Sequence, residues 1–225
     1  MKENIVTKLQ KEANQFIAHN KLVLNGVEIY PKEIEVYYYN DDFKDNAVHK
    51  KSQQTKKYKN HFYVHRCKKS DSYKGGNRAG LDFVVSNDEN TYYSYLIRSA
   101  EINHKLVCGP NNVLNEIKRA CGYDGNAELE KQNINPVSSD VKYEGIIYTT
   151  RFGVGNSVDA YFRGLALRLV VLDNNFKCAQ YKAKEQIVFD YLTQSKITKE
   201  QAEDFCKERL TYLPSKIKEY YGNKN

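Results

Sequence analysis

The sequence lacks the long apolar run that a membrane-spanning helix needs. No stretch of the 225 residues approaches the roughly 20 consecutive apolar residues of a membrane span, so we expect no membrane partner. The first 20 residues alternate charged with apolar side chains, unlike the apolar core of a signal peptide. This pattern argues against secretion. We expect a cytoplasmic protein, associated with the nucleoid if its source is prokaryotic.

Cysteine is sparse and has no metal-binding spacing. The five cysteines are odd in number, lie far apart and form neither a CxxC pair nor a Cys/His cluster. This arrangement gives no indication of a zinc site and favours reduced thiols in an intracellular protein. The positions are Cys67, Cys108, Cys121, Cys178 and Cys206.

The sequence also lacks the common phosphate-binding and hydrolase motifs. It contains no GxGxxG, P-loop, HExxH or GxSxG pattern. Its two glycine-rich pieces, KGGNR and FGVGN, match no spacing that cradles phosphate. Nucleotide-triphosphate and zinc-hydrolase functions are therefore disfavoured, and we expect neither a metal nor an organic cofactor.

The chain nevertheless has ample material for a core. Apolar residues make up 40% of it, with 19 Tyr and 9 Phe but no Trp, and a chain of this length buries roughly 70% of its unfolded surface. Its 35 basic and 28 acidic side chains give a formal charge of +7. This charge favours polyanionic partners but does not by itself identify nucleic acid.

Hydrophobic periodicity predicts an α+β fold. Apolar residues at spacings of three and four predict a helix over 4–18, and β-branched and aromatic runs predict strands over 21–39, with a turn at Asn25-Gly26 and a second strand after Pro31. A long loop over 40–60 follows. Further strands are expected in HFYVHR and GLDFVVS, which form a hairpin with an extended tip, and in TYYSYLIRSAEI, KYEGIIYTT and GLALRLVVLD.

Start and stop signals mark the remaining helices. Gly109-Pro110 opens a helix that Gly122 ends, and a capping box from Thr198 to Gln201 begins a helix near the C-terminus. We expect a single domain with a mixed, mostly antiparallel curved sheet. Its parts are an N-terminal helix (1–20), an α+β body (21–174) and a helical C-terminal extension (175–225).

One predicted strand carries carboxylates on a single face. Alternation in EIEVY places Glu33, Glu35 and Tyr37 on the same side. If that face is exposed, the glutamates are simply solvated. If it lines a cleft, one of them could act as a general base.

Eight short motifs follow one another in an order that resembles the alkyladenine (3-methyladenine) DNA glycosylase family. They are EIEVY, AVH, YVH, GLD, LIRSAEI, GPNNVLNEI, RFGVGN and GLALRLVV, between Val23 and Leu172. The resemblance implies that family's curved sheet. It also implies a base-excision repair enzyme that acts as a monomer on double-stranded DNA and hydrolyses the N-glycosidic bond of a flipped, alkylated or deaminated purine.

The resemblance also assigns roles to residues. Glu35 matches the glutamate that deprotonates the attacking water, and Arg98 and the backbone carbonyl of Phe152 match the groups that hold this water. Tyr37 and His49 match the residues that sandwich the base. These types suit the chemistry, because a carboxylate stabilises oxocarbenium-like charge and aromatic rings replace the stacking that an extruded base loses.

Three positions depart from the family's pattern. His65 stands where the family usually has a third aromatic, a tyrosine, and an imidazole can still stack. Asp82 stands at the pocket asparagine that screens out normal guanine, so base selectivity should change, because an ionised carboxylate only accepts hydrogen bonds. The hairpin tip is longer than in the family, and Tyr73 is its only aromatic residue and our candidate wedge for the vacated stack.

Basic residues flank the expected pocket mouth. As phosphate contacts they would give salt-dependent affinity, and as solvated loop charges they would only keep the protein soluble. The candidates for DNA contact are Lys56, Lys57, Lys68, Lys69, Lys74 and Arg78.

Two other function classes stay open. A noncatalytic nucleic-acid-binding module could use the same scaffold, with Asp82 and the altered hairpin marking the loss of base excision. A protein-interaction domain could use the C-terminal helices. Within the enzyme class we expect a monofunctional glycosylase, because the glutamate–water arrangement needs no lysine nucleophile.

Overall fold

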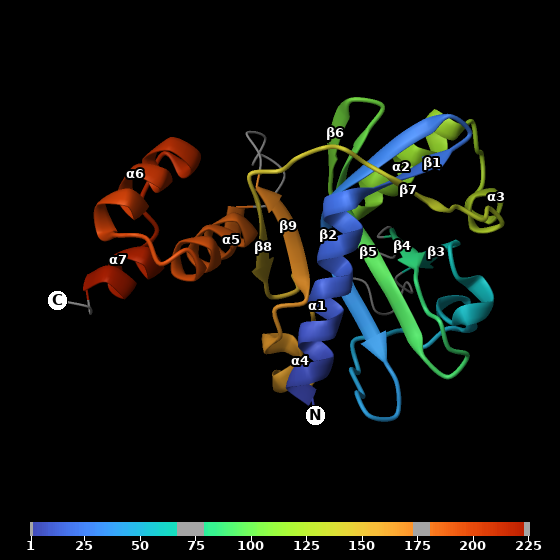
Figure 1. The fold of residues 1–225 in the computed structure, drawn as a ribbon, viewed down its shortest axis with the longest axis horizontal. Helices are drawn as coiled ribbons and strands as arrows, with labels where there is room; N and C mark the ends of the chain where they lie inside the picture. Colours follow the sequence, from blue (N-terminus) through green and yellow to red (C-terminus); the bar gives the residue numbers. More distant parts are fainter. Residues whose placement is uncertain (1, 67–78, 173–180, 223–225) are drawn as a thin grey trace.

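A single antiparallel sheet forms the body of the protein (Figure 1). The structure is a computed structural model that describes residues 2–66, 79–172 and 181–222. Its nine strands are β1 (Asn20–Leu24), β2 (Val27–Tyr39), β3 (Phe62–Arg66), β4 (Ala79–Val84), β5 (Tyr92–Ile102), β6 (Lys105–Cys108), β7 (Pro136–Ser138), β8 (Gly145–Thr149) and β9 (Arg168–Leu172). The main path runs β3-β4-β5-β2-β1-β7, while β6 pairs with β5, and β9 pairs with both β2 and β8.

The β1–β2 hairpin forms at the predicted Asn-Gly turn. Asn25 and Gly26 have φ angles of 50° and 75°. Positive φ at both central residues matches the twist of the flanking strands, and asparagine and glycine adopt it most readily. The turn sets the pairing of Leu24 with Val27 and starts the long strand β2.

Strand β2 runs through Pro31 without a break, so the prediction of two separate strands there is wrong. The pairing with β5 is irregular at this point: Pro31 pairs with Ala100 and Glu33 with Ser99, so the β2–β5 register skips Lys32. Proline has no N–H to donate, and sheets tolerate it at such bulges. The irregularity therefore absorbs the proline while the strand continues.

Two helices pack against the sheet where the sequence predicted them. Helix α1 (Lys2–His19) buries apolar side chains in the core, and the Phe16 ring stacks on Phe83 of β4 at 5.4 Å. Helix α2 (Pro110–Cys121) has Pro110 at its first turn and ends at Gly122, whose φ of 73° is left-handed. The short elements are η1 (Ser52–Gln54), η2 (Lys56–Tyr58), α3 (Asn126–Glu130) and α4 (Ala160–Gly164).

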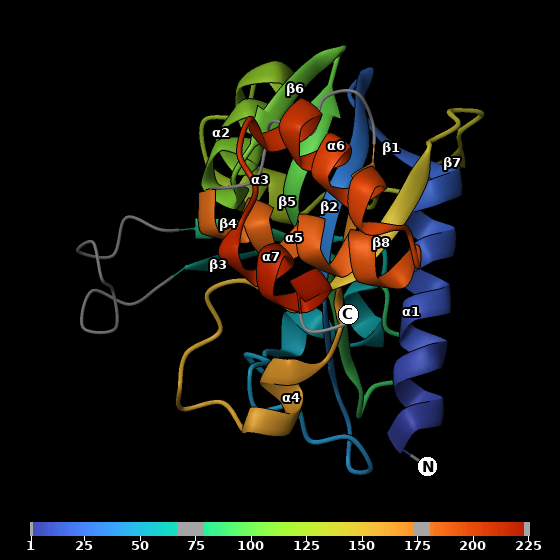
Figure 2. The ribbon, with the colours of Figure 1, turned by 90° about the vertical axis from the view of Figure 1, so that its left-hand side faces the viewer.

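The C-terminal helices build a second apolar core against β8 and β9. They are α5 (Tyr181–Gln194), α6 (Lys199–Leu210) and α7 (Ser215–Gly222). They bury Ile187, Cys206 and Ile217 against Ile147 and Val170 of the sheet. Figures 1 and 2 show this helical layer beside β8 and β9.

Much of this architecture was predictable from the sequence. The α+β class, the hairpin pairing of β3 with β4 and the helical C-terminal region are confirmed. A mixed sheet was expected, but every pairing among the described strands is antiparallel. Strands β6 and β7 were not predicted. The hairpin tip lies outside the described residues.

The expectation of reduced thiols is wrong for Cys108. Cys108 is disulfide-bonded, whereas Cys121 and Cys206 are free. Disulfide formation depends on how closely the fold brings the Cα atoms of two cysteines together, which their spacing along the chain does not reveal.

None of the described helices combines the length and apolar character that crossing a bilayer requires.

Candidate functional site

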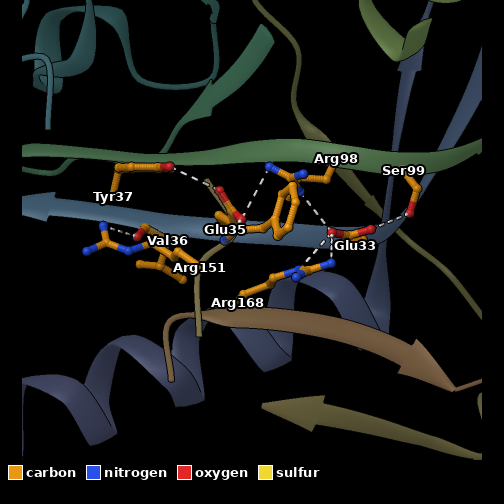
Figure 3. Close-up of polar contacts among 9 residues, drawn as sticks. Glu33, Glu35, Val36, Tyr37, Arg98, Ser99, Arg151 and Arg168 are labelled. Carbon is orange, nitrogen blue, oxygen red and sulfur yellow. Dashed lines mark hydrogen bonds and ion pairs between the residues drawn. The ribbon is translucent and has the colours of Figure 1, made fainter. Parts of the chain in front are cut away.

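The Glu35 carboxylate lies at the centre of a buried polar network (Figure 3). Its side chain is 0% exposed. Oε1 accepts a hydrogen bond from the backbone N–H of Phe152 at 2.7 Å and lies 3.3 Å from a terminal nitrogen of Arg98. Oε2 accepts a hydrogen bond from the Tyr37 hydroxyl at 3.0 Å. The predicted convergence of Glu35 with Arg98 is therefore present.

A second carboxylate shares the same arginine. Glu33 Oε1 accepts from Arg98 Nε at 2.9 Å and from Arg168 Nε at 2.8 Å, and Oε2 lies 3.5 Å from the Ser99 hydroxyl. Two carboxylates and two guanidinium groups thus balance in charge within one buried cluster. Buried charges persist in proteins when they are paired in this way.

The backbone irregularity of β5 accompanies this arrangement. Ile97 pairs with Ile34 and Ser99 pairs with Glu33, so Arg98 between them has no partner residue on β2. A bulge redirects a side chain and often lies beside an active site. Here it accompanies the contact of the Arg98 guanidinium with Glu33 and Glu35 of β2.

A third arginine fixes the neighbouring loop. Arg151 and Asp45 form an ion pair at 2.6 Å, with both side chains 0% exposed. Arg151 also donates to the carbonyl of Phe162 at 3.0 Å, and its guanidinium carbon lies 4.9 Å from the centre of the Tyr37 ring. Arg151 therefore joins the loop around Asp45 to the segment around Phe162.

Phe152 contributes its amide and its ring. The amide N–H contacts Glu35, whereas the prediction assigned the carbonyl to a water molecule. The ring centre lies 5.3 Å from the Arg98 guanidinium carbon and 5.9 Å from that of Arg168. The ring therefore lies within cation–π distance of both cations that neutralise the two glutamates.

A cavity of about 240 Å³ opens beside this network. Three of the predicted base-binding side chains, Tyr37, His49 and His65, line it together with Asp82. The remaining lining residues are Asn46, Ala47, Gln54, Gly153, Val154, Gly155 and Val158. The site residues predicted to hold the base thus come together around one hollow.

The Tyr37 hydroxyl connects the cavity to the carboxylate. Tyr37 lines the cavity and donates to Glu35, but the described cavity wall does not include Glu35, Arg98 or Phe152. Burial, followed by the charge of Glu35, raises the pKa of the Tyr37 hydroxyl well above its ordinary value. Tyr37 is therefore a neutral donor at physiological pH.

Asp82 is buried and holds the His65 ring. Asp82 Oδ1 lies 3.1 Å from His65 Nδ1, while Oδ2 accepts from the Ser94 hydroxyl at 3.3 Å. Gln54 donates in turn to the Ser94 hydroxyl at 3.2 Å. Burial alone lowers the pKa of the His65 imidazole, but the charge and hydrogen bond of Asp82 outweigh it, so this pKa lies above 6.5.

His49 has the opposite electrostatic environment. Its ring lies 5.2 Å from the His65 ring at an angle of 90°, and its Nδ1 lies 3.4 Å from the Tyr63 hydroxyl. Burial and the neighbouring His65 charge lower the pKa of the His49 imidazole below 6.5. The cavity wall therefore contains one imidazole that favours the charged form and one that favours the neutral form.

Two of the predicted DNA contacts lie in the described part of the chain. Lys56 and Lys57 are exposed on η2, two and three residues after Gln54 of the cavity wall. The other predicted DNA-contacting residues, Tyr73, Lys68, Lys69, Lys74 and Arg78, lie outside the described residues.

Several residues of the site were not identified from the sequence. Gln54 and Ser94 orient Asp82, and Asp45 pairs with Arg151, although none belongs to a recognisable motif. One part of the cavity wall did have a visible sequence signal: the glycine-rich FGVGN segment supplies Gly153 and Gly155.

Comparison with protein-family models finds no match, and no curated protein matches the sequence. The described residues contain no group of three or more histidine, cysteine or acidic side chains placed to hold a metal ion.

Proposed function

We propose that the protein is a monofunctional DNA glycosylase that hydrolyses the N-glycosidic bond of an alkylated or deaminated purine flipped out of duplex DNA. The observation that carries the proposal is the contact between Glu35 and Arg98 beside an aromatic-lined cavity, joined to it by the Tyr37 hydroxyl. The motif order of the sequence supports the same chemistry.

In the proposed reaction Glu35 deprotonates the water that attacks the sugar. Oε1 contacts Phe152 N–H and Arg98, whereas Oε2 accepts from the neutral Tyr37 hydroxyl. Oε2 is thus the oxygen assigned to receive the water's proton. The carboxylate also stabilises the positive charge that develops at the sugar in the transition state.

The size and lining of the cavity suit a single flat base. Its volume of about 240 Å³ is below the roughly 300–1,000 Å³ of pockets for drug-sized ligands. Tyr37, His49 and His65 provide ring surfaces to replace the stacking lost on flipping. Lys56 and Lys57, exposed two and three residues after Gln54 of the lining, are the proposed phosphate contacts.

A noncatalytic nucleic-acid-binding module is the second candidate, and one observation favours it. The Glu35 side chain is 0% exposed and already contacts Arg98, Tyr37 and Phe152. These contacts suit a carboxylate that stabilises the fold of the site and takes no part in a reaction. In that case damaged DNA binds to the cavity and is released unchanged.

An excision screen separates the two candidates. Duplexes that each carry one hypoxanthine, 3-methyladenine or ethenoadenine are incubated with the protein, and abasic sites are measured by alkaline cleavage. The glycosylase proposal predicts excision of at least one of these bases. Glu35→Gln should slow it by roughly 10²–10⁴-fold, the usual contribution of a general base.

Glu28→Gln is the matched control, since Glu28 lies on the same strand and pairs with Lys21 away from the cavity. It should leave the excision rate unchanged. Binding to these duplexes without any abasic product would support the module instead. An excision rate in Glu35→Gln equal to that of the wild type would contradict the proposed role of Glu35.

A further inference from the structure

The wall of the cavity contains an imidazole held in one orientation by a buried carboxylate. Asp82 is 3% exposed, and Ser94 and Gln54 fix its second oxygen through a chain of hydrogen bonds. A carboxylate accepts hydrogen bonds, so His65 Nδ1 must bear the proton that lies between them. Nε2 is then the ring nitrogen that gains a proton when the imidazole becomes charged.

The opposite strand leaves space for this imidazole. Gly80 pairs with His65 across β3 and β4. A Cβ atom at Gly80 would lie 2.4 Å from His65 Cε1 and 2.5 Å from Nε2, closer than real Cβ contacts allow. The His65 ring therefore lies against the backbone of Gly80, in the space that a side chain at residue 80 would occupy.

Building on the glycosylase activity proposed above, we propose that His65, oriented by Asp82, determines which base the cavity accepts. As an imidazolium it donates from Nε2 to an acceptor on the purine. The 6-oxygen of a 6-oxopurine such as hypoxanthine is an acceptor, whereas the 6-amino group of adenine is a donor. The cavity should therefore prefer 6-oxopurines.

The charges that face His65 favour the imidazolium. Asp82 and Glu35 stabilise it, while Arg98 and burial oppose it, and the balance raises its pKa above 6.5. Tyr37 is neutral, and His49 has a lowered pKa, so neither adds a competing positive charge near neutral pH. The raised pKa of His65 and the lowered pKa of His49 thus give the two imidazoles of the cavity wall opposite tendencies to be charged.

This arrangement predicts a pH-dependent specificity with a definite sign. The preference for a 6-oxopurine is fully present below about pH 6.5, where His65 is charged, and is lost as the pH rises through its folded-state pKa. Asp82→Asn removes the charge that raises this pKa. The loss of preference should then occur at lower pH, a shift that a purely structural role for Asp82 would not produce.

The test compares two duplexes that differ in a single base. Each carries one hypoxanthine or one adenine opposite difluorotoluene, which cannot hydrogen-bond to either. Dissociation constants are measured by fluorescence anisotropy and excision rates under single-turnover conditions, both across pH. The wild type should favour hypoxanthine by roughly tenfold to a hundredfold, the range for one hydrogen bond to a charged group.

His65→Phe keeps a ring in the wall but removes the donor, and it should bind both duplexes equally. His61→Phe makes the same change at a residue outside the cavity lining and should keep the preference. An unchanged preference in His65→Phe, or equal binding by the wild type, would overturn this inference. Absence of any excision with a retained binding preference would instead remove only the glycosylase proposal.

Discussion

The site leaves no space for a side chain at Gly80. A methyl group there would lie 2.4 Å from His65 Cε1 and 2.9 Å from Leu96 Cδ1. Gly80→Ala should therefore displace the His65 ring and lower the free energy of unfolding by about 1–3 kcal/mol, the usual cost of overpacking. Urea denaturation measures this loss.

Gly145→Ala is the matched control, because nothing lies within 4 Å of a Cβ at that position. Its free energy of unfolding should stay close to that of the wild type. Equal stability of Gly80→Ala and Gly145→Ala would show that the His65 ring does not occupy the position described here.

The buried pair of Asp45 and Arg151 should be sensitive to the loss of one partner. Both side chains are 0% exposed and lie 2.6 Å apart. Asp45→Asn leaves the guanidinium charge buried without its counterion, which should cost about 3–5 kcal/mol of unfolding free energy. The double variant Asp45→Asn with Arg151→Met should recover part of this unfolding free energy. A decrease of less than about 1 kcal/mol in Asp45→Asn alone would contradict the pairing.

At the residue scale, the sequence predicted which side chains meet but not how each is used. Motif order indicated Glu35, Arg98, Tyr37 and His49 together. It could not show that Asp82 would bind the His65 imidazole, because that contact depends on strand register and on a glycine across the sheet. Side-chain pairing of this kind is decided by tertiary packing and not by local pattern.

Among the secondary-structure elements, the capping box of α6 is the best-defined local signal. Thr198 accepts a hydrogen bond from the N–H of Gln201, whose side chain accepts from the N–H of Thr198. Thr198→Ala should destabilise the helix by about 1 kcal/mol. Hydrogen exchange of the α6 amides should become faster.

Thr193→Ala serves as the control for this substitution. The Thr193 hydroxyl bonds to carbonyls of its own helix, α5, at Phe189 and Asp190. Because both carbonyls lie in α5, this substitution should change the hydrogen exchange of the α6 amides little. Equal effects of the two variants would mean that the capping box contributes nothing specific to α6.

The elements that sequence reasoning missed are those with weak local signals. Strand β7 has three residues and β6 has four, which is too short for a clear alternation. The continuity of β2 through Pro31 was missed because proline normally ends a strand, and here an irregular pairing accommodates it. A second pairing irregularity, at Arg98 of β5, helps build the site, and no sequence pattern predicts it.

At the scale of the whole molecule, the positive charge predicts salt-dependent binding to DNA. The formal charge is +7, and Lys56 and Lys57 are exposed shortly after Gln54 of the cavity lining. Lys56→Glu with Lys57→Glu should weaken duplex binding and lower the slope of log affinity against log salt by about 2, since each phosphate contact contributes roughly 0.9. Anisotropy titrations at several salt concentrations measure this slope.

Lys207→Glu with Lys218→Glu changes the net charge equally on the exposed surface of the C-terminal helices. If contact near the cavity matters, this pair should leave the slope nearly unchanged. Equal effects of both pairs would show that binding follows net charge and not a surface beside the cavity.

The general architecture was more predictable than its details. Period and turn chemistry predicted the α+β class, the first helix, the Asn25-Gly26 turn and the C-terminal helices. They could not show that α5, α6 and α7 would form their own apolar core on β8 and β9. That packing depends on which face of the sheet remains uncovered, a property of the assembled fold.

The most direct test of the central claim is a crystal structure of Glu35→Gln bound to a duplex that contains one hypoxanthine. The account predicts that the base leaves the stack and enters the cavity beside Tyr37, His49 and His65, with its sugar within reach of residue 35. A base still stacked in the duplex, or a cavity that stays empty while DNA binds elsewhere, would contradict it.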